Sequence, residues 1–148
     1  MSHTLDNIDK AILNLLQDDA TLPLKTVAER VHVSIATAQR RIQALIDSDV
    51  ITKQVAIVNP DKVGYGLTAV VMIEMERSNT SMQHRFERLM DAQSRIMSCY
   101  EVSGDFDFML MVNAKNMSDY HHFTRSLLTY ENNVRNFKSQ FVMNFTKS

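Results

Sequence analysis

The spacing of hydrophobic residues changes once along this chain, and that change limits the possible folds more than any other feature. Up to residue 47 the apolar residues recur every three or four positions, as Ile8, Ile12 and Leu15 do, which is typical of amphipathic helices. Beyond residue 66 several segments alternate every second position, which is typical of strands with one buried face. A chain of 148 residues with this pattern is long enough for two very small domains.

The first part of the chain predicts a group of helices followed by strand. The expected helices and strands lie at about 5–17, 24–31, 35–47, 50–51 and 55–58. Asp6 and Asp9 resemble an N-cap pair for the first helix, and Ser34 is a favourable N-cap for the third. We therefore expect a plain or winged helix-turn-helix over residues 1–60, with residues 55–58 forming a hinge strand.

The second part alternates between strand and helix after a break at Gly64 and Gly66. The expected order is strand, helix, strand, strand, helix, strand, at 67–76, 80–92, 96–103, 106–112, 118–130 and 134–146. We expect Asn79 or Ser81 and then Ser118 to cap the two helices, and Ile96, Ser98, Tyr100 and Val102 to share one face of their strand. This order is the ferredoxin-like βαββαβ unit, so we expect an α+β protein with this domain at 61–148.

The composition limits which partners the protein can bind and in which cellular compartment we expect it. The formal net charge is −1, so attraction to nucleic acid has to come from a local basic patch. Residues 24–46 supply one, because they hold four basic side chains and one acidic side chain, a local charge of +3. The single cysteine, Cys99, cannot form an intramolecular disulfide, and no apolar stretch has the length of a signal peptide or a membrane span. We expect a cytoplasmic protein that does not bind membranes.

The segments 24–31 and 35–47 fit a helix-turn-helix, in which the second helix enters the major groove of DNA. His32 occupies the turn position that often needs a left-handed backbone, which histidine tolerates. We predict that seven residues contact double-stranded DNA: Lys25, Ser34, Ile35, Thr37, Gln39, Arg40 and Arg41. Thr37 and Arg40 are the candidates for base edges, and Arg41 is a phosphate or structural contact. The alternative is a three-helix structural module that binds no DNA.

The whole chain resembles the Lrp/AsnC family of leucine- and asparagine-responsive regulators, also called feast/famine proteins. The resemblance spans about 5–147, and its most specific block is Cys99-Tyr100-Glu101-Val102-Ser103-Gly104-Asp105-Phe106-Asp107-Phe108. The chain departs from the family pattern at Asp49, where glycine is usual, at Asn132-Asn133, which replaces a Pro-Gly-like turn, and at 18–21, which lacks the usual Gly-Arg. Asparagine can supply the same left-handed turn.

The resemblance implies a sequence-specific transcription regulator of amino-acid or nutrient-response genes. It also implies a homodimer formed through the C-terminal sheets, assembly of dimers to an octamer, and a free amino acid bound between dimers. We expect no metal and no cofactor other than this amino-acid effector.

An amino-acid effector needs N–H donors for its carboxylate and an acceptor for its ammonium. The turn Ser103-Gly104-Asp105 can expose backbone amides, because glycine lets the backbone approach a ligand closely, and Asp107 is a candidate ammonium partner. The resemblance implies that Asp107 and Gln140 match positions implicated in the effector response. It places further residues in matching segments: Tyr100, Glu101, Val102 and Met117.

The chain holds ten methionines, which is many for its length. Five of them fall in predicted strands: Met72, Met75, Met109, Met111 and Met143. Methionine adapts its shape to irregular contacts, so core and interface packing is one interpretation. The other is a soft pocket that selects leucine or methionine over polar amino acids.

Two other function classes stay open. One is a small ferredoxin-like enzyme using Asp105 and Asp107, although no histidine or nucleophile lies beside them in the sequence and no nucleotide or zinc motif is present. His121 and His122 are adjacent on a predicted helix, so they cannot chelate one metal together. The other class is an amino-acid-sensing adaptor without DNA binding. The basic patch favours the regulator over both.

Overall fold

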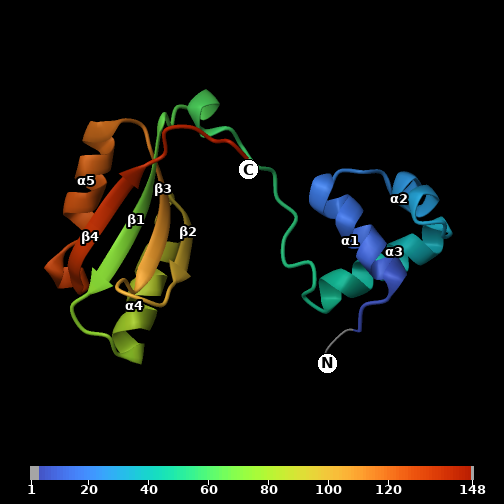
Figure 1. Cartoon of the computed structure of the whole chain (residues 1–148), viewed down its shortest axis with the longest axis horizontal. Coiled ribbons are helices and arrows are strands. Elements are labelled where there is room, and N and C mark those ends of the chain that lie inside the picture. Colours follow the sequence, from blue (N-terminus) through green and yellow to red (C-terminus); the bar gives the residue numbers. More distant parts are fainter. Residues whose placement is uncertain (1–3, 148) are drawn as a thin grey trace. The chain divides into compact units, whose positions relative to one another are not determined.

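The computed structural model describes residues 4–147, and the chain separates into two compact units between Ile57 and Val58. Within the described residues, the first unit holds helices only and the second holds one sheet with its helices (Figure 1). The outer ends of the two expected domains, residues 1–3 and 148, lie outside the described residues.

The first unit consists of α1 (Asn7–Asp18), α2 (Leu24–Arg30) and α3 (Ile35–Asp47). Asp6 caps α1 in a capping box, in which the Asp9 amide donates to the Asp6 carboxylate at 2.8 Å and the Asp6 amide donates to the Asp9 carboxylate at 3.2 Å. This confirms the predicted N-cap pair. Ile12, Val27 and Leu45, one from each helix, are fully buried and form the centre of the core.

Among residues 4–147, three residues other than glycine have left-handed backbone. The non-glycine residues with positive φ among the described residues are His32 (58°), Asp49 (58°) and Asn133 (64°). His32 lies in the turn between α2 and α3, which the Val33 amide closes by donating to the Ala28 carbonyl at 3.0 Å. Histidine, aspartate and asparagine are the side chains best tolerated in this conformation, so the departures at positions 49 and 133 preserve the turns.

The expected hinge strand at 55–58 is wrong for the described chain, and so is the strand at 50–51. The structure assigns no strand between residues 48 and 66, so the first unit is a plain helix-turn-helix without a wing. A strand needs a neighbour to pair its backbone N–H and C=O groups, and the described part of the chain supplies none here. Val55 and Ile57 are 69% and 83% exposed, so no surface among the described residues covers the apolar side chains that predicted a strand.

The second unit is the predicted βαββαβ fold. Its elements are β1 (Leu67–Met75), α4 (Thr80–Asp91), β2 (Ile96–Glu101), β3 (Phe108–Ala114), α5 (Met117–Leu127) and β4 (Val134–Phe141), with short 3₁₀ helices at Pro60–Val63 and Tyr130–Asn132. The strands pair antiparallel in the order β2-β3-β1-β4. The ferredoxin-like topology expected from the sequence is confirmed.

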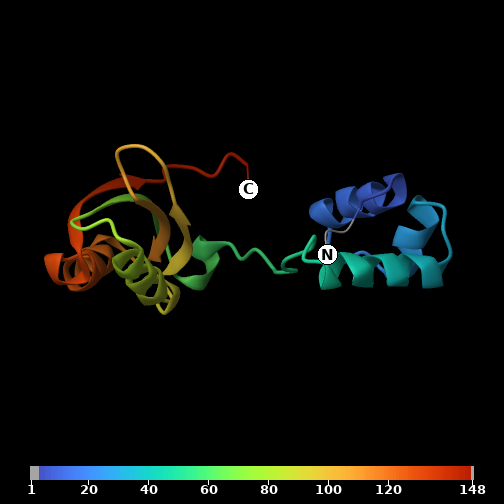
Figure 2. The same ribbon diagram turned by 90° about the horizontal axis from the view of Figure 1, so that it is seen from below.

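Both long helices, α4 and α5, pack on the same face of the sheet (Figure 2). Phe86 of α4 meets Phe108 of β3 with ring centroids 4.8 Å apart, and Phe123 of α5 is buried in the same cluster. The opposite face of the sheet is covered by no helix of the described chain. Its centre is apolar and half-exposed, and consists of Val70, Met72, Tyr100, Met109 and Met111.

Three local predictions in this unit are wrong. The register shifts between Ile96 and Ser98, so Ile96 pairs with core-facing Val112, whereas Ser98 pairs with Met111 on the open face. A bulge of one residue turns the side chains that follow to the other face. Asn116, not Ser118, caps α5 by accepting from the Asp119 amide at 2.8 Å. β4 ends at Phe141, and Met143 lies beyond it, 94% exposed.

Candidate functional site

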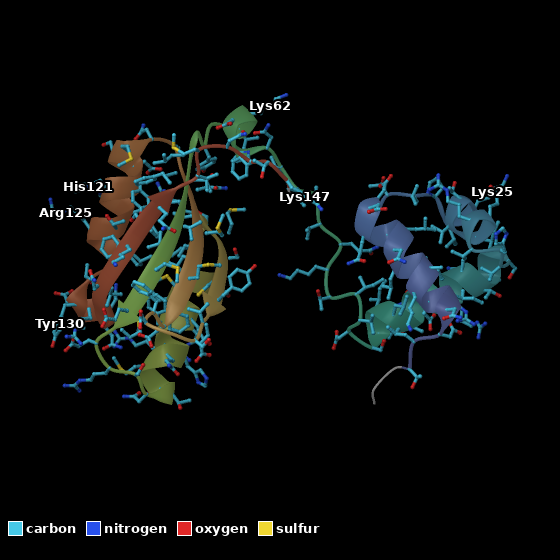
Figure 3. All side chains as sticks on the ribbon, viewed as in Figure 1. Lys25, Lys62, His121, Arg125, Tyr130 and Lys147 are labelled. Atoms are coloured by element: carbon cyan, nitrogen blue, oxygen red, sulfur yellow. The ribbon has the colours of Figure 1, made fainter. Side chains whose placement is uncertain are left out.

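The exposed side of α3 carries most of the predicted DNA contacts. Ile35 is 49% exposed, and Gln39 and Arg40 are exposed one turn further along. These residues lie in the first half of the helix, which is the half that meets base edges when a recognition helix enters the major groove. Lys25, at the start of α2, projects away from the helical core (Figure 3).

Ser34 and Thr37 are tied together at the start of α3. The Thr37 amide donates to the Ser34 hydroxyl at 3.1 Å, and that hydroxyl lies 2.9 Å from the Thr37 hydroxyl. This confirms Ser34 as the N-cap of the helix. Thr37 is half-buried, and both its amide and its hydroxyl are hydrogen-bonded to Ser34. A contact between Thr37 and DNA would therefore need a second hydrogen bond from the Thr37 hydroxyl.

Arg41, although adjacent to Arg40, is turned into the unit. Its guanidinium donates to the carboxylates of Asp6 and of Asp9, the latter at 3.2 Å. The Asp9 side chain is only 5% exposed, and that of Arg41 is 24% exposed. No pattern in the sequence predicts this cluster, because Asp6 and Arg41 lie 35 positions apart and no spacing rule joins them.

The Asp6 carboxyl makes the helical unit sensitive to acid. The hydrogen bond from Arg41 and the Asp9 amide hold the pKa of Asp6 at about 2, below its ordinary value of 3.8. A depressed pKa in the folded state contributes stability that is complete above the unfolded pKa and is lost as the pH falls through the folded pKa.

We therefore expect the thermal midpoint of the helical unit to fall between pH 4 and pH 2 more steeply in the wild type than in Asp6→Asn. Asparagine is also a good N-cap, so this variant keeps the cap and loses the charge together with the oxygen that accepts from Arg41. Circular dichroism melts across this pH range measure the difference. Asp91→Asn, an exposed change in the second unit, should keep the wild-type slope, and equal slopes for the wild type and Asp6→Asn would contradict the prediction.

The predicted effector turn lies between β2 and β3. Gly104 has φ of 107°, and a Cβ built on it would meet no atom within 4 Å, so the turn needs glycine for its conformation and borders open space. Ser103 and Asp105 on either side are exposed. Tyr100, Glu101 and Val102 lead directly into this turn from β2, so the structure brings the predicted residues 100–105 together.

Asp107 closes the same connection from the other side. Its carboxylate accepts from the Met75 amide at 2.7 Å and from the Ser78 hydroxyl at 3.2 Å. Its own amide donates to the Ile73 carbonyl at 2.7 Å, and its carbonyl accepts from the Val102 amide at 3.0 Å. Asp107 therefore fastens the predicted effector turn to the end of β1, a role that no local pattern in the sequence predicts.

Gln140 lies far from this turn within one chain. It is exposed on β4, where it pairs with Val70 of β1, and β4 and β2 are the opposite edges of the sheet. Three strand spacings separate those edges, about 14 Å, which is more than one free amino acid spans. An effector that touches both Gln140 and the turn at 103–105 has to lie between two chains.

The cysteine and histidine side chains that could take part in catalysis or metal binding do not form a site among the described residues. Burial raises the pKa of the Cys99 thiol to about 11, so the thiol stays protonated at neutral pH. His121 and Arg125 project from α5 away from the sheet (Figure 3). Within residues 4–147 no three His, Cys, Asp or Glu side chains are grouped to hold a metal ion, and no helix is long and apolar enough to cross a membrane.

Comparison with known proteins matches both units to one family. Residues 5–46 match the AsnC-type helix-turn-helix domain, and residues 68–148, more than half of the chain, match the Lrp/AsnC ligand binding domain. This chain belongs to the Lrp/AsnC family. An HTH-type transcriptional regulator of Haemophilus influenzae is 52% identical to this Lrp/AsnC protein. The match covers all 148 residues of this chain and 88% of the relative. The DNA-binding transcriptional activator DecR of Escherichia coli K12 is 30% identical, with 94% of this chain and 91% of the relative covered.

Solved structures of Lrp/AsnC regulators share the fold of the whole chain. A transcriptional regulator from Neisseria meningitidis in complex with L-methionine has a TM-score of 0.89 at 27% identity, covering 98% of this chain and 94% of that one. A feast or famine regulatory protein from M. tuberculosis complexed with L-methionine has a TM-score of 0.86 at 26% identity, with 98% and 96% covered. These relatives are transcriptional regulators, and this protein is an Lrp/AsnC-type transcription regulator.

Proposed function

We propose that this protein binds a specific site on double-stranded DNA through α3, and that a free amino acid, with methionine or leucine favoured, changes that binding. The observation that carries the DNA half of the proposal is the exposed first half of α3, which presents Ile35, Gln39 and Arg40 on a capped helix. In a homodimer two such helices meet a pseudo-palindromic site, because a two-fold axis in the protein matches one in the DNA.

The effector half of the proposal rests on the turn at 103–105. Its glycine leaves the backbone open to a ligand carboxylate, and the Asp107 carboxylate lies at the base of the same connection for the ligand ammonium. The matched ligand binding domain and the two methionine-bound structures support an amino acid as the ligand. The distance between Gln140 and the turn supports a site shared by two chains.

The open face of the sheet supports a homodimer. Its centre holds the apolar side chains of Val70, Met72, Met109 and Met111, and an apolar sheet face is stable when a second layer covers it. These methionines therefore belong to the proposed dimer contact and not to the effector turn. Dimers then assemble further, to an octamer, in the cytoplasm, where the protein controls genes of amino-acid or nutrient response.

Calorimetry with methionine, leucine and asparagine tests the effector. We expect methionine or leucine to bind more tightly than asparagine, because ligand sites bury most of the ligand and an apolar side chain gains free energy when it leaves water. Asparagine binding far more tightly than either would contradict the choice of ligand and leave the DNA half of the proposal intact.

A further inference from the structure

Arg40 and Arg41, which are adjacent on α3, have different surroundings: Arg40 is exposed, and Arg41 is partly buried against two carboxylates. We propose that they divide the work of DNA recognition: Arg41 is a positioning residue held by Asp6 and Asp9, and Arg40 is the side chain that reads a guanine in each half of the DNA site. The inference rests on the proposed function, because it names which base and which residue give the α3 surface its specificity.

Each of the four carboxylate oxygens of Asp6 and Asp9 accepts a hydrogen bond within this cluster. In Asp6, one oxygen accepts from the Asp9 amide and the other from Arg41. In Asp9, one oxygen accepts from the Asp6 amide and the other from Arg41 at 3.2 Å. The same two carboxylates therefore form the capping box of α1 and bind Arg41. If Arg41 turned away, both carboxylates would lose their ion-pair partner.

The position of Arg41 also keeps it from DNA. Its Nε is buried and has no hydrogen-bond partner among the described residues, and its side chain is mostly covered. A phosphate contact would require the guanidinium to leave both carboxylates and turn outward. Arg41 instead fixes the middle of α3 to the beginning of α1, while Leu45 fixes its last turn in the core. These two contacts set the direction in which α3 presents its exposed face.

Arg40 has the freedom that Arg41 lacks. It is exposed, and within residues 4–147 no group is hydrogen-bonded or ion-paired to it. It lies one position from Gln39, on the face that carries the exposed residues of α3. An arginine that meets the major groove from a helix forms its best paired hydrogen bonds with O6 and N7 of guanine.

The charge of the nearby surface agrees with this division. Asp6 and Asp9 together more than offset the charge of Arg41. With Glu29 as the one acidic side chain at 24–46, the basic side chains that remain near the α3 surface are Arg40 on α3 and Lys25 and Arg30 on α2. Only the first of these lies on the recognition helix. The specificity of the helix for guanine therefore depends on a single cation in each protomer.

Arg40→Met and Arg41→Met are matched variants, since they remove the same group from neighbouring positions. Each full-length protein is used to select sites from a random duplex pool, is titrated with the wild-type site at several salt concentrations, and is melted. For Arg40→Met we expect an unchanged melting midpoint and a selected site that has lost its preference at one position in each half. The affinity should fall by about 5- to 150-fold for each half-site, because each bidentate arginine–guanine pair is worth about 1–3 kcal/mol. For Arg41→Met we expect a lower midpoint, the same selected site and the same salt dependence.

Asp6→Asn tests whether Arg41 positions α3 or contacts a phosphate, because it keeps the cap of α1 and removes one of the two carboxylates that hold Arg41. If Arg41 positions α3, this variant weakens DNA binding or leaves it unchanged. A salt slope lowered by about 0.9 per protomer in Arg41→Met would identify Arg41 as a phosphate contact and overturn the inference. Tighter binding in Asp6→Asn that is lost when Arg41→Met is added would also overturn it, because a gain from the lost carboxylate charge alone does not need Arg41. An unchanged selected site in Arg40→Met would also overturn it. Absence of DNA binding by the wild type would instead contradict the proposed function, and the melting midpoints would still decide whether Arg41 supports the helical unit.

Discussion

Replacing Leu45 with alanine should abolish DNA binding and leave amino-acid binding intact. Leu45 is fully buried at the centre of the helical core, with Ile12 and Val27. Removing a buried leucine side chain costs about 2–5 kcal/mol, because the lost contacts leave a cavity. A unit of this size buries little surface and is marginally stable, so a loss of that magnitude removes most of its stability.

Leu110→Ala is the matched control, because Leu110 is equally buried in the core of the second unit. It should weaken amino-acid binding and dimer formation, and should leave the helical unit folded. Thermal melts followed by circular dichroism, together with calorimetry and DNA titration, measure both variants. A single unfolding transition that shifts equally in the two variants would contradict the division into two units with separate cores.

Changing Asp107 to asparagine should weaken effector binding by about 10- to 150-fold without destabilising the fold. The asparagine side chain would still accept from the Met75 amide and could donate to the Ser78 hydroxyl, so both local hydrogen bonds survive. The change removes only the negative charge that we propose for the effector ammonium. A hydrogen bond to a charged group is worth about 1.5–3 kcal/mol, which gives the expected range. Calorimetry with methionine measures the loss.

Asp107→Ala tests the fastening role of the same residue. Alanine leaves the Met75 amide and the Ser78 hydroxyl without their acceptor, which costs about 1–3 kcal/mol of stability. We expect this variant to lose stability as well as ligand affinity. If Asp107→Asn binds methionine as the wild type does, then Asp107 only fastens the turn, and the ammonium partner is another residue.

The sequence predicted the order of the elements in the second unit, because each strand and helix there carries its own local pattern. It also predicted the left-handed residue at His32 and the cap at Asp6, since both depend on backbone preferences of neighbouring residues. The face assigned to Ile96 was wrong because a one-residue bulge changes the register with little trace in the apolar pattern.

Features that depend on distant residues could not be read from spacing. The segment 55–58 has the composition of a strand, but its pairing depends on a surface that the described chain does not provide. The sequence left Arg41 open as a phosphate contact or a structural contact, and only the fold brings Asp6 and Asp9 against it. The role of Asp107 similarly depends on Met75 and Ser78, which lie about thirty residues before it.

Binding of the wild-type protein to a selected duplex pool, at two salt concentrations and with or without methionine or leucine, tests the central claim most directly. The proposed function predicts salt-dependent binding, enrichment of a pseudo-palindromic site, and an affinity for that site that changes when the amino acid is added. Failure to bind any duplex at low salt would contradict DNA recognition by α3. Binding that is the same at saturating methionine and leucine would contradict the amino-acid response.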